Sequence, residues 1–221
     1  MDKKPHILTL NRSNTASHET ALLQCREALE TGGVVIVPTD TVYGIACLAD
    51  RAGAIRRIFE IKNRPLDRPI ALLVSSVKSP VDYGMQKDSL FAALSAYWPG
   101  PITFAAPTSM KLEEGVRGED NTVGIRSPNH SWLQQLLSSL PAPLAATSAN
   151  LSGLPEAHSV GEMDKRMLTS VDLVIDGGII ADPVPSTVVM KRESEWTIIR
   201  EGAIPRDVLE RDIRSVHSQF D

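Results

Sequence analysis

Short unbroken apolar runs alternate with amphipathic segments along this chain, and this alternation limits the possible folds more than any other feature. Val34–Val37 and Pro69–Val74 show no polar alternation, which is typical of strands buried on both faces. Segments with helical spacing separate most of these runs, which predicts an α/β fold. The runs at 186–190 and 196–200 have no helix between them, so we expect a twisted, mixed parallel and antiparallel sheet flanked by helices.

The boundaries of the expected helices follow from capping residues and glycines. Ser17 is expected to cap a helix that ends at Gly32–Gly33, and Asp50 to cap the next one. Further helices are expected at about 87–98, at 129–140 and from 205 onward. Strands are expected at 34–37, 69–74, 102–106, 122–126, 143–146, 171–175, 186–190 and 196–200, with a polar loop at 38–44.

Composition excludes several classes of protein. The 221 residues are 42% hydrophobic and contain no apolar run near the roughly 20 residues of a membrane span. A polar stretch at 11–19 lies where a signal peptide would be apolar, so a cytoplasmic location is expected. Two cysteines, Cys25 and Cys47, and five scattered histidines predict neither a disulfide scaffold nor a protein-built metal site.

The net charge of −4 argues against a surface built to bind nucleic acid throughout. Six basic residues against two acidic ones at 51–68 make this stretch the best candidate for binding an anion. A solvated helix face explains the same residues, and composition does not decide between the two.

The chain has neither a P-loop nor a dinucleotide-binding glycine motif, so phosphate contacts must come from side chains. Two pairs of polar residues are candidates for contacts with phosphate or ribose, and the members of each pair are two positions apart. Pro65 disfavours a helical Arg64, so Lys62 and Arg64 are expected on one face of an extended segment. Ser148 and Asn150 follow a predicted strand end, where α/β sheets bind ligands. A helix C-terminus and a polar turn, respectively, explain the same residues.

Eight motifs, in order along the chain, resemble the YrdC family. They are VPTDTVYG (37–44), KNRP (62–65), WPGPITF (98–104), VGIR (123–126), TSAN (147–150), IDGG (175–178), STVV (186–189) and IIREG (198–202). Each motif is weak alone, but their joint match from about Gly32 to Gly202 is highly specific. The resemblance implies a YrdC-like catalytic domain at 17–205, after an N-terminal extension at 1–16 and before a C-terminal helix at 206–221 packed on the same domain.

The resemblance also implies an activity: L-threonine, bicarbonate or CO2, and ATP give threonylcarbamoyl-AMP and pyrophosphate. It implies nucleotide contacts by the K-x-R and S-x-N pairs, which we take as the catalytic residues, with further contacts near ATP and near threonine. The implied ATP site comprises Lys62, Arg64, Thr122, Ser148, Asn150 and Arg200, and the implied threonine site Thr39, Tyr43, Arg126 and Ser186. Mg2+ is expected to arrive with ATP.

The expected partners are the downstream machinery that transfers threonylcarbamoyl to tRNA, with weak or indirect RNA contact and no membrane. Leu73 stands where some members have a polar residue near threonine, and Glu156 stands where others have a hydroxyl that faces the nucleotide. About twenty residues follow Gly202, so no lid from an additional C-terminal domain is expected. An RNA-binding module of the same fold and a carbamoyl-adenylate module related to hydrogenase maturation are the alternatives.

Overall fold

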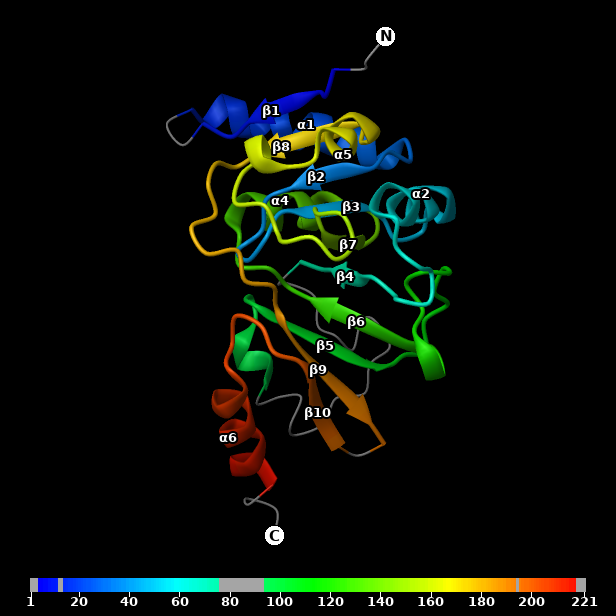
Figure 1. Cartoon of the computed structure of the whole chain (residues 1–221), viewed down its shortest axis with the longest axis vertical. Helices are drawn as coiled ribbons and strands as arrows, with labels where there is room; N and C mark the ends of the chain where they lie inside the picture. Colours follow the sequence, from blue (N-terminus) through cyan, green and yellow to red (C-terminus); the bar gives the residue numbers. More distant parts are fainter. Residues whose placement is uncertain (1–3, 12–13, 76–93, 194, 218–221) are drawn as a thin grey trace.

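Ten strands form one mixed sheet in the computed structural model, which describes residues 4–11, 14–75, 94–193 and 195–217. The strands are β1 (Ile7–Thr9), β2 (Val35–Val37), β3 (Gly44–Leu48), β4 (Ala71–Leu73), β5 (Ile102–Pro107), β6 (Thr122–Arg126), β7 (Leu144–Ser148), β8 (Leu173–Asp176), β9 (Thr187–Arg192) and β10 (Glu195–Arg200). Their order is β1-β8-β2-β3-β7-β4-β6-β5-β9-β10 (Figure 1). β1 and β2 pair with β8, β4 with β6 and β5 with β9 in parallel, whereas the other neighbours are antiparallel. The predicted α/β class with a mixed sheet is confirmed.

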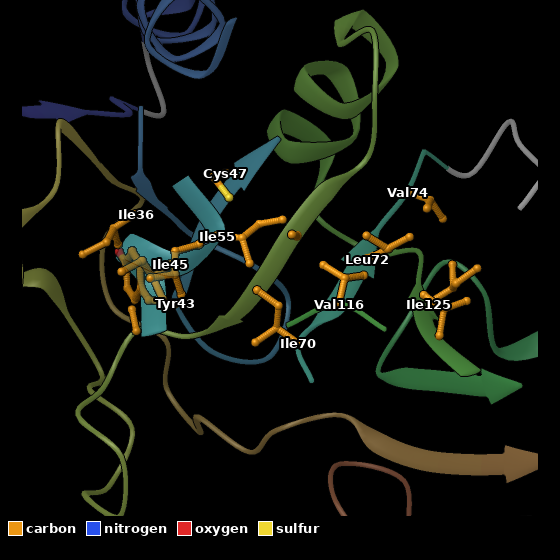
Figure 2. Packing of buried hydrophobic residues seen from close by; sticks show 14 of the residues in the cluster. Ile36, Tyr43, Ile45, Cys47, Ile55, Ile70, Leu72, Val74, Val116 and Ile125 are labelled. Carbon is orange, nitrogen blue, oxygen red and sulfur yellow. The ribbon is translucent and has the colours of Figure 1, made fainter. Parts of the chain in front are cut away.

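Helices cover both faces of the half of the sheet between β1 and β7 (Figure 1). The helices are α1 (Thr15–Glu30), α2 (Ala52–Lys62), α4 (Ser131–Ser139), α5 (Lys165–Ser170) and α6 (Arg206–His217). α1 and α4 pack on one face, through Leu29 and Trp132 against Val35. α2 and α5 pack on the other face, where Ile36, Ile45 and Ile55 lie in one cluster (Figure 2). Burying one such aliphatic side chain contributes about 1.5–3 kcal/mol, so these two layers hold the sheet together.

Two predicted helix caps are wrong. α1 begins at Thr15, and the side chain of Asn14 rather than that of Ser17 accepts the first amide hydrogens, at 3.0 Å from Ala16 and 3.3 Å from Ser17. Arg51 precedes α2 without a side-chain cap, and the Asp50 carboxylate lies 3.6 Å from its Nε. The glycine stop of α1 is confirmed, since Gly32 has a φ of 86° and Gly33 donates to the Ala28 carbonyl at 2.8 Å.

The structure contains two strands, β1 and β3, that the sequence does not predict. β3 begins at Gly44, the last residue of the segment expected as a loop, and pairs antiparallel with β2. β1 pairs with β8. The helix expected at about 87–98 falls mostly outside the described residues, which show a short 3-10 turn at Ser95–Tyr97. The described part of the chain contains no helix long and apolar enough to cross a membrane.

Candidate functional site

A cavity of about 290 Å³ lies over the face of the sheet that α1 and α4 leave uncovered at β4, β6, β5 and β9. The alternation of side chains between the two faces of the sheet explains why a cavity forms on this face. Small or polar residues such as Ala71, Thr103 and Gly124 face the cavity, while large apolar neighbours such as Phe104 and Ile125 lie in the cluster on the other face. A cavity of this size with convergent polar groups is the usual form of a small-molecule site. The sheet face therefore forms the floor of the site, which extends beyond the strand ends where ligands were expected.

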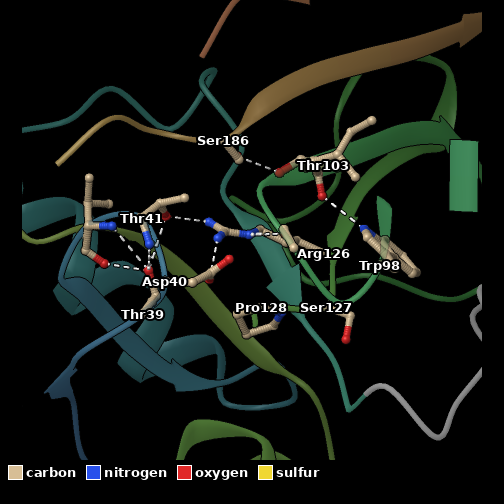
Figure 3. Close-up of polar contacts among 12 residues, drawn as sticks. Thr39, Asp40, Thr41, Trp98, Thr103, Arg126, Ser127, Pro128 and Ser186 are labelled. Atoms are coloured by element: carbon tan, nitrogen blue, oxygen red, sulfur yellow. Dashed lines mark hydrogen bonds and ion pairs between the residues drawn. The ribbon is translucent and has the colours of Figure 1, made fainter. Parts of the chain in front are cut away.

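Arg126, the last residue of β6, lies in the cavity wall with only 7% of its side chain exposed. Its Nε donates to the Gly100 carbonyl at 3.1 Å, and its Nη1 donates to Thr41 Oγ1 at 2.7 Å. Its Nη2 forms an ion pair with Asp40 (Figure 3). Burial lowers the pKa of Arg126, and the neighbouring Asp40 charge opposes that shift. Arg126 is thus a fixed, buried cation and not the surface ion pair that is the ordinary alternative at a strand end.

Thr39 shapes the loop between β2 and β3. Its hydroxyl donates to the Val42 carbonyl at 2.6 Å and accepts from the amides of Thr41 at 3.1 Å and Val42 at 3.2 Å (Figure 3). Thr39 also lines the cavity. These contacts form the hydroxyl-capped turn that explains the loop structurally, and the same turn places Thr39 on the wall.

Arg200 and Ser186 contact each other in the wall of the cavity. Arg200 donates through Nη2 to the Ser186 carbonyl at 2.8 Å and to Ser186 Oγ at 3.2 Å. Ser186 Oγ lies 2.7 Å from Thr103 Oγ1 (Figure 3), and Thr122 lines the wall at the start of β6. Burial lowers the pKa of Arg200, and the Glu156 carboxylate on the same wall opposes that shift.

Lys62 lies behind this wall with 2% exposure. Its ammonium donates to the carbonyls of Ser148 and Asn150 and, at 3.2 Å, to Asn150 Oδ1. Ser148 Oγ donates to the same Asn150 oxygen at 2.6 Å, and Ser148 lines the cavity. Burial, with a smaller contribution from the Arg64 charge, lowers the pKa of Lys62 to about 8, while Glu156 acts in the opposite direction. The structure therefore brings Lys62, Ser148 and Asn150 into one hydrogen-bonded unit.

Arg64 reaches the cavity by a different backbone path from the one expected. α2 ends at Lys62, Asn63 is left-handed with φ 49° and ψ 48°, and the Arg64 amide donates to the Phe59 carbonyl at 2.9 Å. Lys62 and Arg64 are therefore not two residues of one extended segment, and that expectation is wrong. Arg64 lines the cavity, with Nε 2.9 Å from the Arg68 carbonyl.

Carboxylates neutralise much of the basic stretch at 51–68. Arg56 pairs with Glu114 at 3.3 Å and Arg57 with Asp172 at 2.6 Å, both outside the cavity lining. Arg64 is the basic residue of this stretch that lines the cavity, and Lys62 lies directly behind it. The candidate anion site thus includes fewer basic residues than the charge count at 51–68 predicts.

Tyr43 lies away from the cavity lining. Its hydroxyl donates to the Gly178 carbonyl at 2.6 Å and accepts from the Gly177 amide at 3.1 Å, and its ring belongs to the cluster on the other face of the sheet. It therefore joins the 38–44 loop to the turn after β8. Burial raises its pKa to about 12, so the hydroxyl stays protonated at neutral pH.

Several residues of this site lie outside the predicted set. Asp40 and Thr41 hold Arg126, and Thr103 contacts Ser186. Leu73 and Glu156, which the resemblance places near the substrates, line the cavity. Asp40 and Thr41 belong to a predicted motif, but nothing in their spacing indicates a contact with a residue 85 positions away. Period-two alternation along the 102–106 strand gives a signal for Thr103. Among the described residues, no group of three or more His, Cys, Asp or Glu side chains could hold a metal ion.

Comparisons with known proteins show which family the chain is similar to. The family model for Sua5, YciO and YrdC proteins, described as telomere recombination, matches residues 27–202. A threonylcarbamoyl-AMP synthase from Pyrococcus abyssi is 31% identical over 85% of this chain, and the chain spans 56% of that protein's length. A threonylcarbamoyl-AMP synthase from Vibrio parahaemolyticus is 29% identical over 81% of this chain and 97% of its own length.

A solved structure has a similar fold. P. abyssi Sua5 complexed with L-threonine superposes with a TM-score of 0.83 at 30% identity, over 94% of this chain and 60% of that one. This chain thus spans less than two thirds of the P. abyssi proteins, although it matches nearly the whole Vibrio relative. The family match covers most of the chain and includes every residue that lines the cavity. The chain belongs to the Sua5/YciO/YrdC family, as its eight motifs predict.

Proposed function

We propose that this chain is a threonylcarbamoyl-AMP synthase, which condenses L-threonine, bicarbonate or CO2, and ATP into threonylcarbamoyl-AMP and pyrophosphate. One observation carries the proposal: a single cavity holds three guanidinium groups, of Arg64, Arg126 and Arg200, together with threonine and serine hydroxyls. Guanidinium groups suit both phosphate and carboxylate, which are the anionic groups of these substrates. Two relatives named threonylcarbamoyl-AMP synthase and the threonine-bound Sua5 support this choice of substrates.

The proposed nucleotide site is the wall formed by Arg64, Thr122, Ser148 and Arg200, with Lys62 and Asn150 directly behind Ser148. Arg64 and the Lys62 charge would neutralise the triphosphate and the charge that builds up on it during transfer. Ser148 and Asn150 would orient the nucleotide. In this scheme Mg2+ would enter the site bound to the phosphates of ATP.

The proposed threonine site is the part of the cavity lining that contains Arg126, Thr39 and Ser186. The Arg126 fork suits an amino-acid carboxylate, and hydroxyls suit the threonine hydroxyl. Tyr43 would contribute by fixing the loop that carries Thr39. Leu73 supplies an apolar part of the cavity lining, and Glu156 places a carboxylate near Arg200.

The proposed chemistry depends on positioning more than on covalent catalysis. The threonine amine adds to CO2 and loses a proton to give a carbamate. A carbamate oxygen then attacks the α-phosphorus of ATP, and the bond to pyrophosphate breaks. Holding both substrates in one cavity replaces a bimolecular encounter, and fixed cations stabilise the developing charge. The product would pass to separate machinery that modifies tRNA.

Pyrophosphate release from ATP tests the proposal. The wild-type protein should release pyrophosphate only when both L-threonine and bicarbonate are present, and serine should be a poorer substrate. Equal release with no amino acid would remove the synthase proposal. The same measurement distinguishes the synthase from the carbamoyl-adenylate and RNA-binding alternatives, since neither alternative requires threonine.

Two arginine variants sharpen the measurement. Arg64→Ala should lower kcat/KM at least about tenfold, or about 1.4 kcal/mol of transition-state stabilisation. Arg56→Ala is the matched control, because Arg56 belongs to the same basic stretch but pairs with Glu114 on the exposed surface. Equal losses in the two variants would show a general effect of charge and not a contact in the cavity.

A further inference from the structure

Arg126 has two N–H groups more than its observed protein contacts require. A guanidinium group carries five N–H donors, and three of those of Arg126 are directed at Gly100, Thr41 and Asp40. One donor remains on each terminal nitrogen. These two donors are available to a carboxylate, which accepts charge-assisted hydrogen bonds from a guanidinium group.

The residues that hold Arg126 lie behind the cavity wall. Thr39, Val42 and Gly44 of the β2–β3 loop line the cavity, whereas Asp40 and Thr41 are not among the described lining residues. Asp40 and Thr41 are nevertheless buried, with exposed fractions of 13% for the Asp40 side chain and 2% for Thr41. A ligand in the cavity would therefore meet Arg126 and not these two residues, which contact the guanidinium tip (Figure 3).

The loop that supplies these contacts is itself fixed. Thr39 Oγ1 accepts from the amides of Thr41 and Val42 and lies 3.1 Å from Thr41 Oγ1. The two acceptors for Arg126 are therefore held in place by hydrogen bonds within the loop. A long arginine side chain without such partners would lose orientation, because immobilising a rotamer-rich side chain on binding costs conformational entropy.

We propose that Asp40 and Thr41 are positioning residues, which hold the Arg126 guanidinium from behind so that its remaining N–H groups receive the substrate carboxylate. The proposal rests on the proposed function, since it takes the threonine carboxylate as the ligand of Arg126. Asp40 and Thr41 would act through Arg126 and would not contact the substrate. Their removal should weaken recognition of the carboxylate much more than binding of the nucleotide.

Calorimetric titration with L-threonine and with L-threonine amide, which lacks the carboxylate, tests the proposal without depending on turnover. The wild type should bind threonine more tightly than the amide. Asp40→Ala should raise the Kd for threonine at least about tenfold and leave the Kd for the amide within about twofold, so that discrimination is lost. Asp40→Asn should lose less, because its amide oxygen can still accept from Nη2, and Thr41→Val should lose discrimination by removing the acceptor for Nη1.

Asp172→Asn is the control, because it alters another Arg–Asp pair, the partly exposed pair with Arg57, away from the cavity lining. It should reduce thermal stability and leave threonine discrimination unchanged. If Asp40→Ala does not fold, Asp40→Asn and Thr41→Val still give the ratio of the two dissociation constants. Unchanged discrimination or tighter threonine binding in the Asp40 variants would overturn the positioning role alone. A wild type that does not prefer threonine over its amide would contradict the carboxylate site of the proposed function as well.

Discussion

The Lys62 ammonium is fully buried beside the cavity, where three neutral oxygens of Ser148 and Asn150 accept its hydrogen bonds. Burial lowers its pKa from 10.5 to about 8, so the positive charge is lost just above neutral pH. We expect the affinity for ATP to fall as pH rises from 7.5 to 9.5, because ATP keeps its charge over this range and Lys62 does not.

Equilibrium binding of ATP across this pH range checks the prediction. In Lys62→Met the affinity should be low and independent of pH, whereas the exposed control Lys165→Met should follow the wild type. Measuring thermal stability at each pH distinguishes a loss of ATP affinity from unfolding of the protein. Since folding lowers the pKa, the unfolded chain binds more protons between pH 8 and 10.5, and the contribution of Lys62 to stability rises with pH in that window. A pH-independent affinity in the wild type would contradict a phosphate role for this charge.

Side-chain pairs close in sequence were the predictable part of the site. The two-residue spacing of Ser148 and Asn150 indicates one polar unit, and they do share a hydrogen bond at 2.6 Å. The Arg126–Asp40 pair joins residues 86 apart, and no local pattern reports such a contact. The left-handed backbone of Asn63 explains why Lys62 and Arg64 do not lie on one extended segment. Pro65 restricts the backbone of Arg64, but it does not restrict that of Asn63, so the sequence does not indicate this turn. The binding roles themselves came from the family resemblance and stay a prediction.

The N-terminus of α1 gives a prediction at the scale of one element. Asn14 Oδ1 accepts from two amides of the first turn, whereas Ser17 lies within that turn and donates to the Asn14 carbonyl at 2.7 Å. Asn14→Ala should therefore lower the free energy of unfolding by about 1 kcal/mol, and Ser17→Ala by less. Urea denaturation of the two variants measures the difference. A larger loss in Ser17→Ala would restore Ser17 as the cap.

Elements with strong periodicity were predictable, and short or pairing-dependent ones were not. Thr122–Arg126 is a strand with the bounds expected, and α4 lies within the helix predicted from its Trp132 and Leu133 stripe. β1 has three residues and forms only by pairing with β8, far along the chain. β3 follows a seven-residue loop motif and lacks a β-branched run, so its Ile45–Leu48 segment gives no strong strand signal. Both strands depend on tertiary pairing more than on local preference.

The charge of the whole molecule bears on how the product would reach tRNA. The net charge is −4, and ion pairs neutralise Arg56 and Arg57 within the basic stretch. Tight RNA binding depends on many unpaired cations that release counterions from phosphates. We therefore expect weak, strongly salt-sensitive tRNA binding and no modified adenosine until a separate transferase is added. Mass spectrometry of digested tRNA checks this, and stoichiometric modification by the chain alone would contradict it.

The most direct test of the proposed function is the identity of the product. The purified chain is incubated with ATP, L-threonine and 13C-bicarbonate, and the nucleotides are analysed at once by mass spectrometry. We predict a threonylcarbamoyl-AMP that carries one 13C, formed in step with pyrophosphate and lost in Arg64→Ala but not in Arg56→Ala. Formation of ADP and phosphate, or of an adenylate without the 13C label, would contradict the account.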